Sequence, residues 1–266
     1  LGALSQVTNK VKLGTGIVNI HSRTPATVAM AISTLDILSN NRSILGLGVS
    51  TPALVENWHG IKFDNPLEKM REYIECIRMI MRGSKVKFEG KYFRINDFKI
   101  LFKPQRENIP IYTAAVNNGM IDLSCELSDG VLLYLRSKNE LKKGVDRILN
   151  NISGKENVGN YDEKMGENGI NNIKDKDKVK DKDKDKEDDE SKQKRNFEIC
   201  YAFITAISDK EPDKARERAA KTLAFYVAVG KYYNRYLLKT GYEYEVNNIT
   251  EEYKKRNGIE NIHKFV

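Results

Sequence analysis

The hydrophobic and polar positions of this chain alternate between short apolar runs and stretches of helical periodicity. Residues 11–19 are strand-like, residues 43–49 are a short and almost wholly apolar run that predicts a strand, and each stretch contains two glycines. Such runs suit parallel strands that are buried on both faces. Between them, "RTPATVAMAISTLDILS" carries apolar residues at spacings of three and four, behind a threonine cap and a proline at the first helical position. Strand, helix and strand in this order predict a βαβ unit.

The same alternation continues along the rest of the chain. After the helix in "NPLEKMREYIECIRMIM" comes a small hairpin that turns at Glu89-Gly90. The order of strands and helices predicts an α/β fold with a parallel sheet wrapped by helices. The pattern places the hairpin at 86–95, strands at 109–116, 129–135 and 197–208, and helices at 117–128, 138–151 and 212–230.

The helix in "NPLEKMREYIECIRMIM" has the clearest start signal. Asn65 is predicted to cap it, with Glu68 at the capping-box position. Apolar residues at spacings of three and four mark its expected buried face. They are Leu67, Met70, Ile74, Ile77 and Met81.

A charged low-complexity segment divides the chain. Residues 174–195 hold ten Lys or Arg against nine Asp or Glu. Alternating lysine and aspartate cannot bury a core, so residues 152–196 are predicted to be a disordered surface insertion. The expected division is barrel units with the hairpin at 1–151, this insertion, and a further barrel unit with C-terminal helices at 197–266.

The net charge of +8 is compatible with nucleic acid or with an anionic small ligand. The basic residues form no concentrated stripe and the Lys-rich run is nearly neutral, so we expect no nucleic-acid partner. No apolar run approaches the length of a membrane span. Cys76, Cys125 and Cys200 are far apart and odd in number, which predicts buried free thiols, no metal site and a reducing cytoplasm.

Glycine pairs in "GTG" and "GLG" end the first two predicted strands. A dinucleotide-binding loop needs a third glycine, but that position holds Asn19 in one strand and Thr51 in the other. Two interpretations remain: the glycines let a ligand approach the backbone, or they permit tight packing between strands.

A third strand end, in "AAVNNG", leads into a helix. Free backbone N–H groups and the helix dipole suit a phosphate there. A plain turn with asparagine as the helix cap explains the same residues equally well.

Several segments together resemble the bacterial luciferase-like superfamily. They are "LGTGIVNIHSRTPATVAMAISTLDILSNNRSILGLGVS", "NWHGIKFDNPLEKMREYIECIRMIM", "FEGKYFRI", "PIYTAAV" and "LSDGVLL". The similarity is greatest to its coenzyme F420-dependent oxidoreductase branch, which includes methylenetetrahydromethanopterin reductase-like enzymes. It covers residues 1–150 closely and 197–266 more loosely. The resemblance implies a (β/α)₈ TIM barrel, here expected to be incomplete, without its first two and last βα units.

The resemblance also implies a cofactor site at the carboxyl ends of the strands. It places a non-prolyl cis peptide bond at Gly16-Ile17, against the central ring of the deazaflavin. The other residues that it implies are Asn19, Gly48, Val49, Ser50 and Thr51 beside the cofactor, and Val116, Asn117 and Gly119 at its phosphate.

The expected function is hydride transfer between coenzyme F420 and a small organic substrate, by a protein that is a homo-oligomer at full length. One alternative is an FMN-dependent monooxygenase of the same superfamily. Another is a non-catalytic cofactor-binding relative or an inactive fragment. No catalytic residue is assigned, because the family's second strand, which supplies proton donors, is expected to be absent and Thr51 stands where some relatives carry a carboxylate. His21, Glu56 and His59 are expected in solvated loops, and Trp58 is expected to pack.

Overall fold

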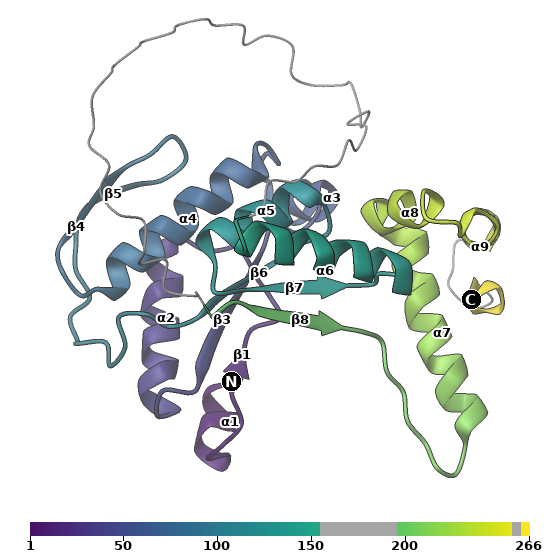
Figure 1. Cartoon of the computed structure of the whole chain (residues 1–266), viewed down its shortest axis with the longest axis horizontal. Coiled ribbons are helices and arrows are strands. Elements are labelled where there is room, and N and C mark those ends of the chain that lie inside the picture. Colours follow the sequence, from purple (N-terminus) through teal and green to yellow (C-terminus); the bar gives the residue numbers. More distant parts are fainter. Residues whose placement is uncertain (155–195, 257–261) are drawn as a thin grey trace, which may run out of the picture.

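A computed structural model describes residues 1–154, 196–256 and 262–266 (Figure 1). The predicted insertion at 152–196 lies almost wholly outside these residues. The strands are β1 (Leu13–Gly14), β2 (Val18–Asn19), β3 (Ser43–Gly48), β4 (Val86–Glu89), β5 (Arg94–Phe98), β6 (Ile111–Ala114), β7 (Gly130–Tyr134) and β8 (Glu198–Ala202). The helices are α1 (Gly2–Val7), α2 (Pro25–Leu38), α3 (Pro52–His59), α4 (Pro66–Met81), α5 (Asn118–Leu127), α6 (Lys138–Ile152), α7 (Pro212–Val229), α8 (Lys231–Leu238), α9 (Glu243–Arg256) and the 3₁₀ helix η1 (Ile262–Phe265).

Six strands form one parallel sheet, as the βα alternation predicts. Its order is β1-β3-β6-β7-β8, and β2 also pairs with β3. Helices α2, α4, α5 and α6 cover one side of this curled sheet, while β4 and β5 form a separate antiparallel hairpin (Figure 1). The architecture is therefore α/β, with a half-barrel of parallel strands.

The predicted strand at 11–19 is interrupted. Leu13 and Gly14 of β1 pair with Ser43 and Ile44, and Val18 of β2 pairs with Leu47. From Gly14 to Val18 the chain advances four residues while its partner advances three, so one strand bulges between the two pairings. The peptide bond Gly16-Ile17 inside this bulge is cis, as the family resemblance implies.

Helix α4 packs as its periodicity predicts, but its start is different. Met70, Ile74, Ile77 and Met81 are all buried, whereas Leu67 is 38% exposed. The predicted capping box is wrong. Asn65 has a left-handed backbone and its side chain makes no capping hydrogen bond.

Glu68, the other half of the expected box, has other partners. Its Oε2 accepts from Lys91 Nζ at 3.0 Å and from Tyr92 Oη at 2.9 Å. Because both partners follow strand β4, the carboxylate joins the helix to the hairpin instead of capping its own turn.

The main core lies between the sheet and the helices that cover it. A second cluster is built by the C-terminal helices, from Ala224, Val227, Val246, Ile249 and Ile262. Helices α7 and α8 lie beside the carboxyl ends of β7 and β8 (Figure 1). Strand β8 is shorter than its predicted range of 197–208, and no ladder partner is described for residues 203–208.

The expectation of three buried cysteines is correct only for Cys76. All three thiols are free, but Cys125 and Cys200 are only half-buried. Burial, and then the nearby carboxylates of Glu72 and Glu75, raise the pKa of Cys76 to about 12, so this thiol stays protonated. Among the described helices, none combines the length and the apolar character needed to span a bilayer.

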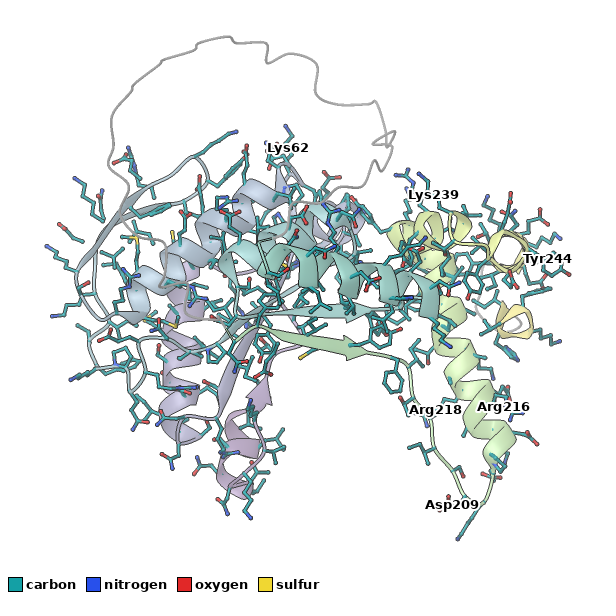
Figure 2. All side chains as sticks on the ribbon, in the orientation of Figure 1. Lys62, Asp209, Arg216, Arg218, Lys239 and Tyr244 are labelled. Atoms are coloured by element: carbon teal, nitrogen blue, oxygen red, sulfur yellow. The ribbon has the colours of Figure 1, made fainter. Side chains whose placement is uncertain are left out.

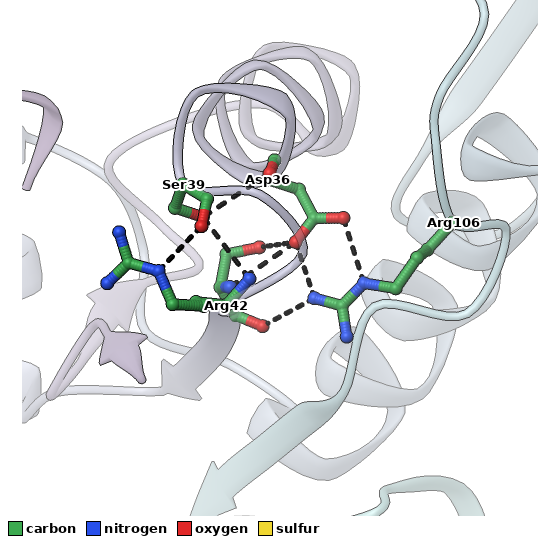
Figure 3. Close-up of polar contacts among 5 residues, drawn as sticks. Asp36, Ser39, Arg42 and Arg106 are labelled. Carbon is green, nitrogen blue, oxygen red and sulfur yellow. Dashed lines mark hydrogen bonds and ion pairs between the residues drawn. The ribbon is translucent and has the colours of Figure 1, made fainter. Parts of the chain in front are cut away.

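An ion pair between a buried carboxylate and a half-buried arginine lies at the amino end of β3 (Figure 3). Asp36 is 1% exposed and accepts from Arg106 Nε at 2.9 Å and from Ser43 Oγ at 2.6 Å. Arg106 also donates to the carbonyl oxygen of Ser43 at 2.9 Å. In α/β barrels the opposite end of the strands binds ligands, so we assign this network to stability.

Candidate functional site

Three of the segments singled out in the sequence meet at one edge of the sheet. Asn19 pairs with Gly48 in register, and β3 pairs with β6 on its other side. A Cβ built at Gly48 would lie 3.5 Å from Cβ of Ala114, the last residue of β6. The carboxyl ends of β2, β3 and β6 therefore lie side by side, which is where parallel α/β folds bind ligands.

The glycines at these strand ends do two different things. A Cβ at Gly16 would meet nothing within 4 Å, so space is open above this part of the backbone. A Cβ at Gly46 would instead overlap the carbonyl oxygen of Thr15, and one at Gly48 would lie 2.7 Å from the Ile17 side chain. Both interpretations of the glycine pairs thus apply: Gly46 and Gly48 permit close packing, and Gly16 leaves an opening.

The segment that follows β3 has an unusual backbone. Ser50 has a φ of 62°, in the left-handed region that non-glycine residues seldom adopt. Thr51 precedes α3 and its hydroxyl does not cap that helix. A non-glycine residue in this conformation carries about 1–3 kcal/mol of strain, and such residues cluster at binding sites.

Two expectations about the next residues are wrong. Glu56 and His59 lie on helix α3 and not in a loop, because Pro52 starts a helix directly after the strand end. Trp58 does not pack: it is 75% exposed on that helix.

His21 is buried, contrary to the expectation of a solvated loop residue. It is 8% exposed, and its Nδ1 lies 3.2 Å from Oδ1 of Asn19, which also accepts from the His21 backbone N–H at 3.0 Å. Burial and the positive charge of Lys69 lower the pKa of His21. Its Nε2 is buried with no hydrogen-bond partner among the described residues.

Helix α5 begins soon after β6 with an asparagine cap. The Asn117 side chain caps α5 by accepting from the backbone N–H of Met120 at 2.9 Å. The first N–H groups of a helix have no partner within it, and Gly119 belongs to this first turn. The simple capping interpretation is thus correct for Asn117, and it is compatible with an anion at the remaining N–H groups.

The sequence did not single out Arg136, which lies beside this loop. Its Nη2 donates to the carbonyl oxygen of Val116 at 2.7 Å. The available signal is an arginine directly after the apolar strand "GVLLYL", where polar residues at strand ends are candidates for a site.

Positive charge is spread over the surface and not gathered at one place. Figure 2 shows Lys62 and Lys239 on separate parts of the fold, with Arg216 and Arg218 together on helix α7. Arg216 is also paired with Asp213 at 3.4 Å. These side chains therefore do not extend the strand-end site.

Known proteins are similar to this chain in sequence and in fold. The chain is 36% identical over 148 residues to 5,10-methylenetetrahydromethanopterin reductase of Archaeoglobus fulgidus, which covers 56% of the chain and 44% of that protein. It is 33% identical over 129 residues to F420-dependent glucose-6-phosphate dehydrogenase of Kineococcus radiotolerans, covering 47% and 38%. The chain thus spans less than half the length of these curated relatives.

A solved structure covers the whole chain. The coenzyme F420-dependent tetrahydromethanopterin reductase of Methanopyrus kandleri superposes with a TM-score of 0.74 at 22% identity, over 100% of this chain and 70% of that one. At this identity the likeness shows the fold, and the half-barrel corresponds to part of that structure. The sequence profile of the luciferase-like monooxygenases matches residues 1–155, more than half of the 266 residues. The chain therefore belongs to the luciferase-like monooxygenase family.

Proposed function

We propose that this protein binds coenzyme F420 and takes part in hydride transfer between that cofactor and a small organic substrate. The observation that carries the proposal is the meeting of three strand ends beside the open backbone of Gly16. The names of the relatives support it, because the dehydrogenase and the Methanopyrus kandleri reductase are both named as F420-dependent.

The residues present fit such a cofactor. A flat ring can approach the backbone at Gly16, where a Cβ would meet nothing within 4 Å. An anionic group fits the start of α5, where helix N–H groups and the dipole favour negative charge. When bound, the deazaflavin supplies the ring carbon that accepts or releases a hydride.

The proposed contacts divide between these two places. The residues proposed to contact the ring are Gly16, Ile17, Asn19, Gly48, Val49, Ser50 and Thr51. Those proposed to contact the phosphate are Val116, Asn117 and Gly119. The chain itself orients these groups: His21 holds the Asn19 side chain, and Arg136 holds the Val116 carbonyl. No acid or base is assigned.

A fluorescence titration of the purified chain tests the proposal. We expect saturable binding of F420 that is tighter than binding of FMN. Gly16→Ala should weaken F420 binding, because its methyl group occupies the open space. Gly2→Ala is the matched control, since that glycine also has nothing within 4 Å but lies in α1.

Three outcomes decide between the alternatives. Binding of FMN in preference to F420 would favour the flavin-dependent monooxygenase. Binding of F420 without hydride transfer to any acceptor would favour a non-catalytic relative. Binding of neither cofactor would overturn the proposal.

A further inference from the structure

The Asn19 side chain, at the carboxyl end of β2, is held only through its oxygen. Its Oδ1 accepts from the backbone N–H of His21 at 3.0 Å and lies 3.2 Å from Nδ1 of the His21 ring. A backbone N–H can only donate, so the amide atom that faces it is the oxygen and not the nitrogen. The other branch of the carboxamide, Nδ2, therefore keeps both of its N–H donors free of His21.

These two donors have no partner within the described part of the chain. Asn19 is half-buried, and Nδ2 is not one of the buried polar atoms that lack a hydrogen bond, so solvent reaches it. Val18 and its register partner Leu47 pack in the core on the helix side of the sheet. Because successive side chains of a strand project on opposite faces, Asn19 and its partner Gly48 project on the other face. This is the face of the strand-end site.

The same contacts determine which ring nitrogen of His21 carries the proton. Oδ1 of Asn19 has no hydrogen to give, so Nδ1 is protonated and donates to it. Nε2 is buried and has no hydrogen-bond partner among the described residues, so a second proton there would be an unsatisfied donor. Burial and Lys69 lower the pKa of the ring, and the Val49 backbone opposes them without reversing the shift. The ring is therefore neutral at pH 7, with its proton on Nδ1.

The His21 ring is itself held in place by the segment that leads into α4. It is 8% exposed and packs against the Phe63 ring, with the two centroids 5.4 Å apart and the planes tilted by 32°. Lys69, whose charge acts on the imidazole, is tied by its Nζ to Asp64 at 2.7 Å. These contacts lie within the chain, so the orientation of the imidazole is set before any ligand binds.

We propose that His21 is a positioning residue of the strand-end site, which holds Asn19 so that the amide N–H groups donate to a carbonyl oxygen of the cofactor's ring. The inference rests on the proposed function for the identity of this ligand. A donor that is already fixed loses little side-chain freedom on binding. It therefore favours a flat ligand with hydrogen-bond acceptors along its edge over a purely apolar ring. His21 acts through Asn19, and no proton transfer is assigned to it.

The tautomer of His21 can be measured directly on the full chain. Long-range ¹⁵N–¹H NMR spectra distinguish protonated from unprotonated ring nitrogens. The chain has three histidines, so the signals that are missing from His21→Leu belong to His21. At pH 8, without F420, we expect the proton on Nδ1. A proton on Nε2 would overturn the inference, because Nδ1 could then not donate to Asn19.

Two variants of His21 test the donor through the affinity for F420, measured by fluorescence titration. The amide nitrogen of an asparagine lies about where Nδ1 of a histidine lies, so His21→Asn keeps a donor to Asn19 and should bind F420 within about threefold of the parent. His21→Leu has no donor and should bind roughly threefold to tenfold more weakly, the value of one hydrogen bond. Equal losses in the two variants would overturn the inference, because they would show that His21 only packs.

Variants of Asn19 test the N–H groups that it presents. In Asn19→Asp the carboxylate still accepts from His21 but has no N–H to donate, so F420 should bind roughly tenfold more weakly or worse. Asn19→Leu is uncharged and should also lose affinity, which separates loss of the donors from charge repulsion. Asn96→Asp, at an exposed position of β5, adds the same charge on the separate hairpin and should bind F420 like the parent. Unchanged affinity in Asn19→Asp would overturn the inference.

The parent chain keeps the two proposals distinguishable. If the parent binds F420 and neither Asn19→Asp nor His21→Leu weakens it, this inference is overturned alone and the proposed function stands. If the parent binds no F420, the proposed function is overturned, and with it the identification of the ligand that accepts from Asn19.

Discussion

At Asp36, burial and charge act in opposite directions. Burial by itself would raise the pKa of this carboxyl, but the hydrogen bonds and charge from Arg106, with those from Ser43, outweigh it and lower the pKa. The carboxylate is therefore charged in the fold at neutral pH, and its partners depend on that charge (Figure 3).

Asp36→Asn should lower the free energy of unfolding at pH 7 by about 1–3 kcal/mol, because it removes the charge of a buried, hydrogen-bonded carboxylate and leaves the half-buried Arg106 without its ion-pair partner. Since the folded pKa is below the unfolded value of about 3.9, the parent's contribution is present above that pH and is lost as pH falls through the folded pKa. Urea unfolding measured from pH 7 downward should show that the free energy of unfolding falls less with decreasing pH in the variant than in the parent. Asp146→Asn, at an exposed position on α6, is the control and should change stability by roughly 0.5 kcal/mol or less. If the variant loses stability at acid pH as steeply as the parent, the Asp36 carboxylate is not the source of that pH dependence.

The fold lowers the pKa of His21, whereas a carboxylate partner would raise the pKa of a histidine. Burial first, and then Lys69, favour its neutral form, and His59 adds a smaller effect of the same sign. The Val49 backbone and the Asp64 carboxylate oppose them without reversing the shift.

Because the folded pKa of His21 lies below the unfolded value of about 6.5, the unfolded chain binds the proton more readily. The free energy of unfolding should therefore fall as pH drops below about 6.5. His21→Gln should reduce this dependence, and His59→Gln, at an exposed position, should retain it. Unfolding curves between pH 8 and pH 5 check this, and an unchanged slope in His21→Gln would exclude His21 as its source.

At the scale of elements, β3 is the strand on which the site depends. It pairs with β1, β2 and β6, and its glycines allow the bulge of the neighbouring strand to lie against it. Gly46 faces backbone at Thr15, whereas Gly48 faces the movable end of the Ile17 side chain.

Gly46→Ala should therefore destabilise the fold much more than Gly48→Ala. Overlap with a backbone oxygen forces two strands apart, at a cost of roughly 3 kcal/mol or more, while Ile17 can shift at about 1–2 kcal/mol. Urea unfolding of both variants measures the difference. An equal loss of unfolding free energy in the two variants would contradict the prediction, because it would show that the backbone at Thr15 moves as easily as the Ile17 side chain.

For the whole molecule, the half-barrel leaves strand edges without a partner among the described residues. Val11, next to β1, is 60% exposed, and Ile207, after β8, is 85% exposed. Unpaired edge strands, and exposed apolar residues in the segments that adjoin them, favour pairing with another chain. We therefore predict that these 266 residues associate or are unstable as a monomer.

Val11→Lys combined with Ile207→Lys should shift the chain toward monomer, because charged side chains oppose edge-to-edge pairing. Sedimentation velocity over a range of concentrations measures this shift. A parent chain that stays monomeric and melts cooperatively would refute the prediction of association.

Much of the fold follows from local pattern. The apolar runs, the helical spacings and the prolines at helix starts predict the parallel βα order, because each is a short-range signal. The capping box at Asn65 failed because Glu68 has partners on the hairpin, which sequence spacing does not show. Trp58 was misjudged because α3 points it outward.

The sequence by itself determined the strand and helix order, the two glycine pairs and the resemblance that identified Gly16-Ile17. These depend on residue type and spacing along the chain. Only the tertiary structure decided that Gly46 serves packing while Gly16 is open, that His21 is buried, and that Arg136 donates to the carbonyl of Val116. The physical reason is that burial and contact are set by neighbours far away in sequence, and no local pattern records them.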